Sequence, residues 1–455
     1  MKETIHFYHT NDLHSHFENW PRIRDLLIER KQFHQDKGEA VFLFDIGDHA
    51  DRWHPLTEGS KGKENIRLLN EAGYDAVTIG NNEGITFSHE DLHHLYDEAQ
   101  FPVVLANLFT SEGERPHWVY PTYITSTEKG TKIGIVAVTA EYPAFYERLG
   151  WLVTPAKDEL KAQVRVLKQK VDIVIFLSHL GIREDEWVAQ ECPEIDVIMG
   201  GHTHHTFQQG KLQNQTLLAA AGKHGAYTGK VEIDFDHQTS SVTRKSASLI
   251  ETSGLKESPK EKQEIQRWMD RGKELLSTVE TSLKDPLPHH PLDPDSVLSS
   301  LLADALLEWC EADCSIITGG LLLDSLSAGP VTAFDLHRIL PHPINPCVVE
   351  LEGSELKEVL RQAQNQDWPT TVVKGLGFRG SILGTFIYKN ILSHSYTFKI
   401  GGEVIQPDKV YRVATVDMFT FGYFFPEMQR AKKEYFMPEF LRDVLKHKLK
   451  NMGAG

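Results

Sequence analysis

Seven side chains that can bind metal ions are spread over the first half of the sequence, each just after a short apolar segment. Imidazole, carboxylate and amide groups together suit Zn, Mn, Fe, Co or Ni better than Ca or Mg alone. Two such divalent ions about 3.5–4 Å apart can bind phosphate oxygens, activate water and stabilise an in-line displacement. The predicted metal ligands are Asp12, His14, Asp48, Asn81, His179, His202 and His204.

The segments that precede these ligands are rich in β-branched residues and end at Gly, Asn, Asp or His, a pattern that predicts buried β-strands. They cover residues 5–8, 41–44, 76–79, 171–177 and 197–199. Segments with helical periodicity, such as 23–33 and 157–170, separate several of them. This alternation indicates an α/β domain, in which ligands gather at the carboxyl ends of the strands. The scattered side chains are therefore expected to converge.

Each motif taken alone also has a structural explanation. Asp12 or Asn81 could cap a helix, and Gly47-Asp48 could form a turn. His179 could be a hydrogen-bonded core residue. The pair His202 and His204 is more specific, and the five motifs in this order favour metal binding, with Asp48 as the bridging carboxylate.

The series Asp12-x-His14, Gly47-Asp48, Gly80-Asn81, His179 and Gly201-His202-x-His204 resembles the signature of calcineurin-like metallophosphoesterases. The opening His9-Thr-Asn-Asp-Leu-His14 and the length resemble the 5′-nucleotidase / UDP-sugar hydrolase / 2′,3′-cyclic phosphodiesterase family. The resemblance implies a four-layer α/β/β/α metallophosphoesterase domain, followed by an α+β nucleotide-binding domain of the 5′-nucleotidase type. It also implies that Asp12, His14, Asp48 and His204 bind one ion, and that Asp48, Asn81, His179 and His202 bind the other.

The resemblance and the change of composition near residue 238 predict three segments. These are the metallophosphoesterase domain at 1–240, a linking helix and Pro/His-rich linker at 241–295, and a 5′-nucleotidase C-terminal-like substrate domain at 296–455. In the last segment, Thr318-Gly319-Gly320 and residues 328–332, 350–356 and 411–415 fit the family pattern. An aromatic group there could stack on a nucleotide base or pack in a core. Its members are Phe419, Phe421, Tyr423 and Phe424.

The sequence departs from the family at the catalytic position. Asn82 stands where the family has a histidine that stabilises the leaving group, and Ile85 replaces the aspartate that orients this histidine. Leu322 replaces a phosphate-binding arginine. Asn82 and Asp48 are the catalytic candidates. Histidines that neighbour the motifs and could replace the missing acid are His49, His54, His205 and His224.

The composition of the chain limits the kinds of molecule that it is expected to bind. The chain has 455 residues, 40% of them hydrophobic, and a formal net charge of −16, which disfavours binding to a nucleic-acid polymer or to an anionic membrane. No signal-like apolar segment is evident, so a cytoplasmic location is expected. The sequence leaves the oligomeric state open.

We therefore expect a dinuclear metal-dependent phosphoesterase, in which a metal-bound hydroxide attacks a small phosphate ester or anhydride, with a nucleotide as the expected substrate. A non-catalytic sensor of metal and phosphoanion is the first alternative, because the family's histidine and arginine are missing. A protein phosphatase is the second.

Overall fold

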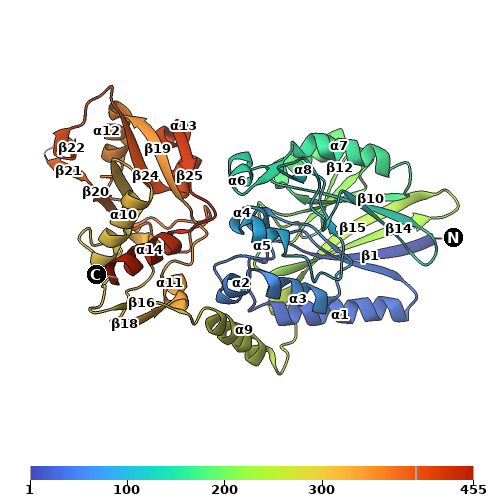
Figure 1. Cartoon of the computed structure of the whole chain (residues 1–455). Helices are drawn as coiled ribbons and strands as arrows, with labels where there is room; N and C mark the ends of the chain where they lie inside the picture. The colour runs from blue at the N-terminus through green and yellow to red at the C-terminus, as the bar shows by residue number, and fades with distance from the viewer. Residues whose placement is uncertain (1, 395–396, 454–455) are drawn as a thin grey trace. The chain divides into compact units, whose positions relative to one another are not determined.

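The computed structural model describes residues 2–394 and 397–453, and the chain forms two compact units, Met1–Gly272 and Lys273–Gly455 (Figure 1). Among the residues it describes, no helix is both long enough and apolar enough to cross a membrane.

Two β-sheets form the centre of the first unit. The first sheet has the order β15-β14-β1-β2-β3-β4-β6, and the second has the order β12-β13-β11-β10-β8-β7. Strands of the first sheet are β1 (Lys2–Thr10), β2 (Ala40–Asp45), β3 (Ala76–Val77), β4 (Val103–Val104), β6 (Val119–Tyr120), β14 (Tyr227–Asp236) and β15 (Ser241–Glu251). Strands of the second are β7 (Thr122–Ser126), β8 (Lys132–Thr139), β10 (Ile173–His179), β11 (Val197–Gly200), β12 (Lys211–Gln213) and β13 (Thr216–Ala220). A separate ribbon pairs β5 (Leu108–Thr110) with β9 (Trp151–Val153).

The strands that lead to predicted ligands run parallel within each sheet. In the first sheet β1 pairs in parallel with β2, and β2 with β3. In the second sheet β10 pairs in parallel with β8 and with β11. Their carboxyl ends therefore lie at one edge of each sheet, which is the arrangement that the sequence pattern predicted.

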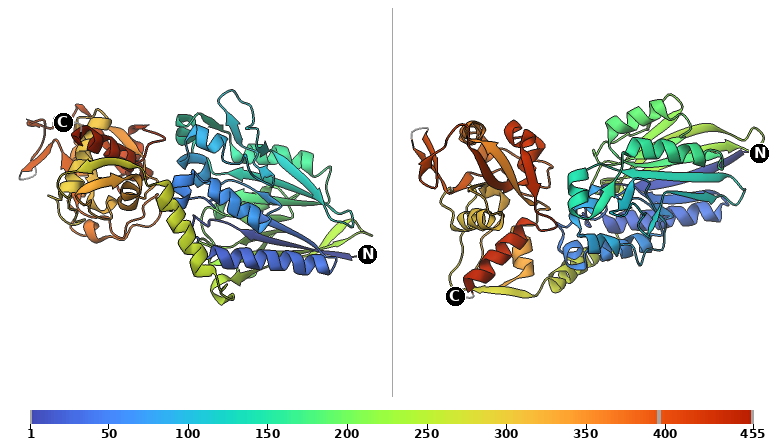
Figure 2. Two further views of the ribbon diagram at one scale, coloured as in Figure 1. Left: turned by 60° about the horizontal axis from the view of Figure 1, so that its bottom comes forward. Right: turned by 45° about the horizontal axis from the view of Figure 1, so that its top comes forward.

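Side-chain alternation explains how the layers pack. Ile173 and Ile175 of β10 lie in the core between the two sheets, whereas Val174 and Phe176 contact the helices on the other face. Helices α1 (Trp20–Asp36) and α3 (Lys63–Ala72) cover the first sheet, and α7 (Ala156–Leu167) and α8 (Ile182–Glu191) cover the second (Figure 1 and Figure 2). The predicted four-layer α/β/β/α domain is confirmed. Four shorter helices are α2 (Pro55–Ser60), α4 (Asn81–Thr86), α5 (His89–His93) and α6 (Pro143–Arg148).

The first unit continues beyond residue 240, where the sequence predicted that the metallophosphoesterase domain ends. Strand β15 pairs antiparallel with β14 from Asp236↔Ser241 to Tyr227↔Glu251. After the turn η1 (Thr252–Gly254), helix α9 (Glu261–Leu275) begins with Glu261, which accepts hydrogen bonds from Arg22 of α1. Strand β15 was missed because its residues are exposed or half-buried on both faces, which gives no clear hydrophobic alternation.

The second unit is an α+β domain, as predicted. Its main sheet has the order β20-β17-β24-β19-β25. These strands are β17 (Cys314–Thr318), β19 (Pro346–Glu352), β20 (Phe386–Lys389), β24 (Val410–Val416) and β25 (Lys432–Tyr435). The helices are α10 (Val297–Trp309), α11 (Ala333–Ile339), α12 (Gly353–Gln362), α13 (Pro426–Arg430) and α14 (Leu441–Gly453). Smaller elements are the pair β16 (Val279–Leu283) and β18 (Gly329–Thr332), the strands β21 (Ile391–His394), β22 (Thr397–Ile400) and β23 (Glu403–Val404), and the turns η2 (Gly319–Leu321), η3 (Trp368–Thr370) and η4 (Asp417–Phe421).

His342 is a buried polar residue in the second unit, and it makes two hydrogen bonds to the backbone. Its Nε2–H donates to the carbonyl oxygen of Leu321 at 2.6 Å, and its Nδ1 accepts from the backbone N–H of Arg379 at 2.8 Å. Only the neutral imidazole can make both bonds, because a protonated Nδ1 has no lone pair. Burial lowers the pKa of His342 to about 3.

Candidate metal centre and active site

The structure brings the seven predicted ligands together at the carboxyl ends of β1, β2, β3, β10 and β11. Two groups have ligand atoms that all lie within 4.8 Å of one another: Asp12, His14 and His204, and Asp12, Asp48 and His179. The remaining two ligands also meet, since Asn81 Oδ1 and His202 Nδ1 are 2.7 Å apart. The rings of His202 and His179 are 5.4 Å apart, which joins this pair to the others.

Asp48 occupies the middle of the cluster. Its Oδ2 lies 3.6 Å from His14 Nε2 and 3.4 Å from His179 Nε2. These two histidines come from different strands and from different predicted ion sites. On the other side, Asp12 Oδ1 lies 3.4 Å from His204 Nε2. The carboxylate of Asp48 therefore lies between one histidine of each predicted ion site.

Backbone strain is concentrated at the predicted ligands. Left-handed backbone is uncommon outside glycine and costs about 1–3 kcal/mol for each such residue, so it persists only where the surroundings enforce it. Five of the seven predicted ligands adopt it: Asp12 (φ 50°), His14 (φ 49°), Asp48 (φ 52°), His202 (φ 70°) and His204 (φ 57°). Strain at these residues points to a demand of function rather than of stability.

Two glycines allow the ligand loops to approach each other. A Cβ atom on Gly80 would lie 2.0 Å from Asp48 Oδ1, and one on Gly47 would lie 2.3 Å from the backbone nitrogen of Gly80. Gly47 also has a φ of 87°. Both positions therefore require glycine, because any side chain would push apart the loops that carry Asp48 and Asn81.

Hydrogen bonds orient two of the histidines from behind. His14 Nδ1 lies 3.1 Å from Asp51 Oδ2, and His179 Nδ1–H donates to the carbonyl oxygen of Ile46 at 2.7 Å. Each ring then presents Nε2 to the carboxylates at the centre. The buried Nε2 of His179 has no hydrogen-bond partner. A histidine that is held through one nitrogen and free at the other is the usual arrangement of a metal ligand.

Glu83 links the two ligand loops through the backbone. Its carboxylate accepts from the N–H groups of Gly80 (2.9 Å), Asp48 (2.9 Å) and Ala50 (2.8 Å), and it is the N3 residue of a capping box on α4. Burial and the charge of Asp48 raise the pKa of Glu83 to about 7. Positive charge beside Asp48 would favour the ionised form, which is the form that can accept all three bonds.

The electrostatics of the cluster favour bound cations. Burial alone would lower the pKa of His14 and of His179, but nearby carboxylates outweigh it and raise both pKa values to about 10. These are Asp12, Asp51 and Asp48 for His14, and Asp48 and Asp12 for His179. Three features fit the binding of two divalent ions. They are the unpartnered Nε2 of His179, the mixture of imidazole, carboxylate and amide groups, and the position of Asp48 between His14 and His179.

Asn82, the predicted catalytic residue, contacts the central carboxylate. Its amide Nδ2 donates to Asp48 Oδ2 at 2.7 Å, and its backbone N–H donates to Asp48 Oδ1 at 2.8 Å. The side chain is buried, and an amide does not titrate near neutral pH. Asn82 therefore positions Asp48 and supplies no titratable proton.

The four neighbouring histidines take different positions. His49 is buried, with its ring nitrogen Nδ1 3.2 Å from Asn65 Nδ2, and His54 Nδ1 caps helix α2 by accepting from the Leu56 N–H at 3.2 Å. His205 is exposed. His224 stacks on His16 with ring centroids 3.7 Å apart, and its backbone N–H donates to the Asp12 carbonyl oxygen. His49 and His54 are thus structural, whereas the other two are at least partly open to solvent.

The four aromatic residues that were predicted to stack on a base differ in their burial. Phe419 and Phe424 are buried at 0% and 6% exposure and pack against each other, and Phe424 also contacts Trp368. They present no free face, so their prediction as base-stacking residues is wrong and the core-packing alternative applies. Phe421 and Tyr423 are 37% and 67% exposed.

Sequence reasoning missed Asp51 and Glu83 as supporting residues. A signal existed for Glu83, because a glutamate three residues after a helix N-cap is the pattern of a capping box. The contact between Asp51 and His14 has no local signal, since it depends on how two loops meet.

Two β-sheets packed face to face and flanked by helices, with two metal-ligand groups that share Asp12 at the carboxyl ends of the strands, define a metallophosphoesterase. Family models agree: the calcineurin-like phosphoesterase model matches residues 5–206, and the 5′-nucleotidase C-terminal domain model matches residues 288–423. The chain belongs to the calcineurin-like phosphoesterases that carry a 5′-nucleotidase C-terminal domain. It is accordingly a phosphoester hydrolase of a family that uses two divalent metal ions.

Individual relatives extend over most of the chain. YunD of Bacillus subtilis (strain 168), an uncharacterised metallophosphoesterase, is 45% identical over 99% of this chain and 100% of its own length. The 5′-nucleotidase of Bos taurus is 24% identical over 78% of this chain and 71% of its length. The structure of the NAD nucleotidase of Haemophilus influenzae matches with a TM-score of 0.69 at 15% identity, covering 99% of this chain and 97% of that one.

Proposed function

We propose that this protein hydrolyses a small phosphate ester or anhydride, with a nucleotide as the substrate, and that it acts in nucleotide breakdown. The observation that carries the proposal is the position of Asp48 between His14 and His179, in a chain with a 5′-nucleotidase C-terminal domain. The names of two relatives, a 5′-nucleotidase and an NAD nucleotidase, support a nucleotide.

In the proposed centre Asp12, His14, Asp48 and His204 would hold one ion, and Asp48, Asn81, His179 and His202 would hold the other. When bound, such a pair neutralises phosphate charge and lowers the pKa of a coordinated water. Asp51 and the Ile46 carbonyl fix the orientation of His14 and His179, and Glu83 holds the Asp48 and Asn81 loops together.

Asn82 determines which leaving groups the enzyme tolerates. A general acid at this position would speed departure of the leaving oxygen by about 10²–10⁴-fold. The amide of Asn82 instead donates a hydrogen bond to Asp48 Oδ2, and it cannot transfer its proton to a leaving group near neutral pH. The proposed enzyme therefore favours substrates whose leaving groups depart unprotonated, such as anhydrides and aryl phosphates. A nucleoside 5′-monophosphate, with an alkoxide leaving group, is turned over more slowly.

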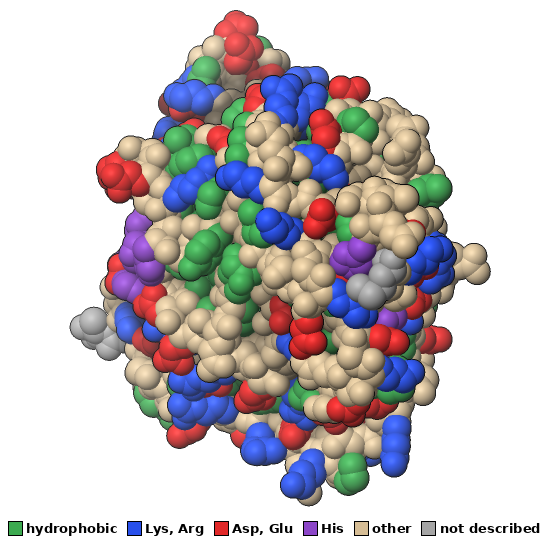
Figure 3. Space-filling view, turned by 90° about the vertical axis from the view of Figure 1, so that its right-hand side faces the viewer, with side chains coloured by type: hydrophobic (Ala, Val, Ile, Leu, Met, Phe, Trp, Pro, Cys, Tyr) green, Lys and Arg blue, Asp and Glu red, His purple; other side chains and the backbone are tan. Residues whose placement is uncertain are grey.

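Surface charge agrees with a small substrate. The chain carries a net charge of −16, and on the face drawn in Figure 3 acidic and basic side chains are interspersed and form no continuous basic patch. A nucleic-acid polymer would need such a patch to neutralise its backbone.

The test is turnover of a series of phosphate compounds whose leaving groups span a wide range of pKa, with Mn²⁺-loaded protein. We expect multiple turnover, a steep fall of kcat/KM as the leaving-group pKa rises, and a flatter slope for Asn82→His. Asn70→His, on helix α3 and outside the centre, is the matched control and should keep the steep slope. Absence of turnover on every compound with both ions bound would overturn the proposal.

A further inference from the structure

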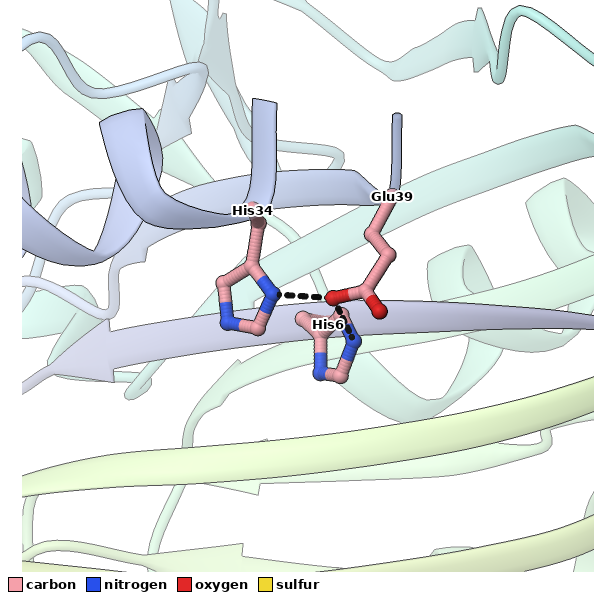
Figure 4. A group of neighbouring side chains, drawn as sticks. All are labelled: His6, His34 and Glu39. Carbon is pink, nitrogen blue, oxygen red and sulfur yellow. Dashed lines mark hydrogen bonds and ion pairs between the residues drawn. The ribbon is translucent and has the colours of Figure 1, made fainter. Parts of the chain in front are cut away.

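A second group of possible metal ligands lies on the helix-facing side of the first sheet. It consists of His6 in the middle of β1, His34 in the last turn of α1, and Glu39 in the turn that follows α1. Figure 4 shows one nitrogen of each imidazole directed at the carboxylate of Glu39. None of these residues belongs to the dinuclear centre.

His6 is an unusual residue for its place. On β1, Ile5 and Phe7 face the core between the sheets, so His6 faces helix α1. It is only 5% exposed, and neither of its ring nitrogens has a hydrogen-bond partner. Burying a polar group without a hydrogen bond is costly, and each such group in a native protein calls for an explanation.

The ligand atoms converge on one point. His34 Nδ1 lies 2.8 Å from Glu39 Oε2, and His6 Nε2 lies 3.3 Å from the same oxygen. The three ligand atoms are all within 4.8 Å of one another. Both histidines are buried, and Glu39, whose side chain is 36% exposed, opens the group to solvent.

Each histidine also has a polar neighbour at its other nitrogen. His34 Nε2 lies 3.0 Å from the hydroxyl of Tyr8, and His6 Nδ1 lies 3.4 Å from Glu232 Oε1 on the paired strand β14. If these outer nitrogens carry the hydrogens, the inner ones present lone pairs to the same point. Ligand histidines are usually held in this way, through a second nitrogen bound to a carboxylate or another acceptor.

We propose that His6, His34 and Glu39 form a third metal site, which binds Zn²⁺ or a similar transition-metal ion. Two imidazole nitrogens and one carboxylate oxygen suit such ions, whereas Ca²⁺ and Mg²⁺ prefer oxygen ligands alone. Zinc is four-coordinate in most sites, so a water molecule completes the set. Tyr8 can accept from His34 Nε2–H, which frees Nδ1 for the ion.

Binding requires a small local rearrangement. The rings of His6 and His34 are stacked, with centroids 3.8 Å apart and planes at 21°. A coordinating nitrogen directs its lone pair in the plane of its ring, so two nearly parallel rings must splay before they can share an ion. The ion therefore replaces ring stacking by coordination, and it competes with the hydrogen that otherwise lies between His34 and Glu39.

The site would fasten helix α1 to the sheet. The turn after α1 is closed by the bond from Glu39 N–H to the His34 carbonyl oxygen at 2.9 Å, with Gly38 in left-handed backbone at φ 67°. An ion held by this turn and by His6 joins the end of α1 to β1. Strand β1 is the strand that leads to Asp12, so the third ion would act as a structural clamp on one support of the active site.

The test is the zinc content of the full chain after equilibration at a buffered free Zn²⁺ concentration. Wild-type protein is expected to hold one zinc more than His34→Asn and one more than Glu39→Gln. The matched controls, His117→Asn and Glu98→Gln, replace exposed residues and should keep the wild-type content. Equal zinc content in wild type and in both ligand variants would overturn the proposal.

Anomalous diffraction at the zinc edge gives a second reading that does not depend on how well a variant folds. A peak beside Glu39 Oε2 in wild-type crystals is expected, and its absence at full occupancy of the dinuclear centre would contradict the site. Turnover of phosphate compounds should be the same in wild type, His34→Asn and Glu39→Gln. Failure of the proposed activity would leave the zinc difference unaffected, so the two proposals fail separately.

Discussion

Replacing Glu83 by glutamine tests how the ligand loops are held together. The wild-type carboxylate accepts three backbone N–H groups: Oε2 accepts from Gly80 and Asp48, and Oε1 accepts from Ala50. A glutamine amide has one oxygen, so its NH₂ group must face at least one of these N–H groups. The variant therefore loses a hydrogen bond to a charged acceptor and leaves a buried donor without a partner.

The size of the effect follows from these contacts. A hydrogen bond to a charged group contributes about 1.5–3 kcal/mol, and a buried group left unsatisfied costs about 1–3 kcal/mol. Allowing for overlap of the two terms, the loops should be destabilised by about 2–4 kcal/mol. Since every 1.4 kcal/mol is tenfold, exchange of the amide hydrogens in segments 47–51 and 79–83 should become about 30- to 700-fold faster. Metal affinity should fall about 10- to 100-fold, as for other residues that support ligands.

The assay is hydrogen exchange read by mass spectrometry, with metal affinity from calorimetry, at pH 8 so that Glu83 is ionised. Glu355→Gln is the matched control, because Glu355 is also the N3 residue of a capping box but makes an exposed bond to the Glu352 N–H at 3.1 Å. It should change stability by less than about 0.5 kcal/mol. If Glu83→Gln behaves like Glu355→Gln, Glu83 does not hold the loops and the reasoning is refuted.

Three further outcomes are expected. Gly80→Ala should displace Asp48, because its Cβ would lie 2.0 Å from Oδ1, and should weaken metal binding in calorimetry; unchanged affinity would contradict this. Phe419→Ala should destabilise the second unit by about 3–5 kcal/mol in chemical unfolding, whereas Tyr423→Ala should cost less than about 0.5 kcal/mol; similar values for both would show that the burial assignment is wrong. His342 binds a proton with a pKa of 6.5 when unfolded but only of about 3 when folded. The unfolded state therefore gains a proton first as the pH falls, and stability is lost from pH 6.5 towards 3. His342→Gln should reduce this loss by up to about 1.4 kcal/mol per pH unit, and an unchanged slope would count against a buried neutral imidazole.

The parts of the fold that carry the predicted ligands could be read from the sequence. Strand β10 was expected at 171–177 and lies at Ile173–His179, because a continuous apolar run ending at a polar residue has few other readings. Because each motif directly follows a strand, the predicted ligands lie at the carboxyl ends of the strands of the two sheets. Strand β15 could not be predicted in the same way, since its partly exposed residues give no alternation.

The supporting residues of the site depend on tertiary contacts and were harder to foresee. Asp51 reaches His14 across 37 positions of sequence, which no local pattern encodes. The burial of Phe419 and Phe424 is decided by packing against Phe386 and Trp368, far away in the chain. An aromatic run alone does not distinguish a core from a stacking surface, because both bury the same rings.

The central claim is that two ions share the carboxylate of Asp48. It is tested most directly by the Mn²⁺ content and the electron paramagnetic resonance spectrum of the protein. Both are measured on the His34→Asn variant, so that the proposed third site does not contribute. Two Mn²⁺ ions per chain with a spin-coupled spectrum are expected. Asp48→Asn in the same background should weaken both ions, because its Oδ2 faces His14 and His179 alike. A single uncoupled ion per chain, or loss of only one ion in Asp48→Asn, would contradict a shared dinuclear centre.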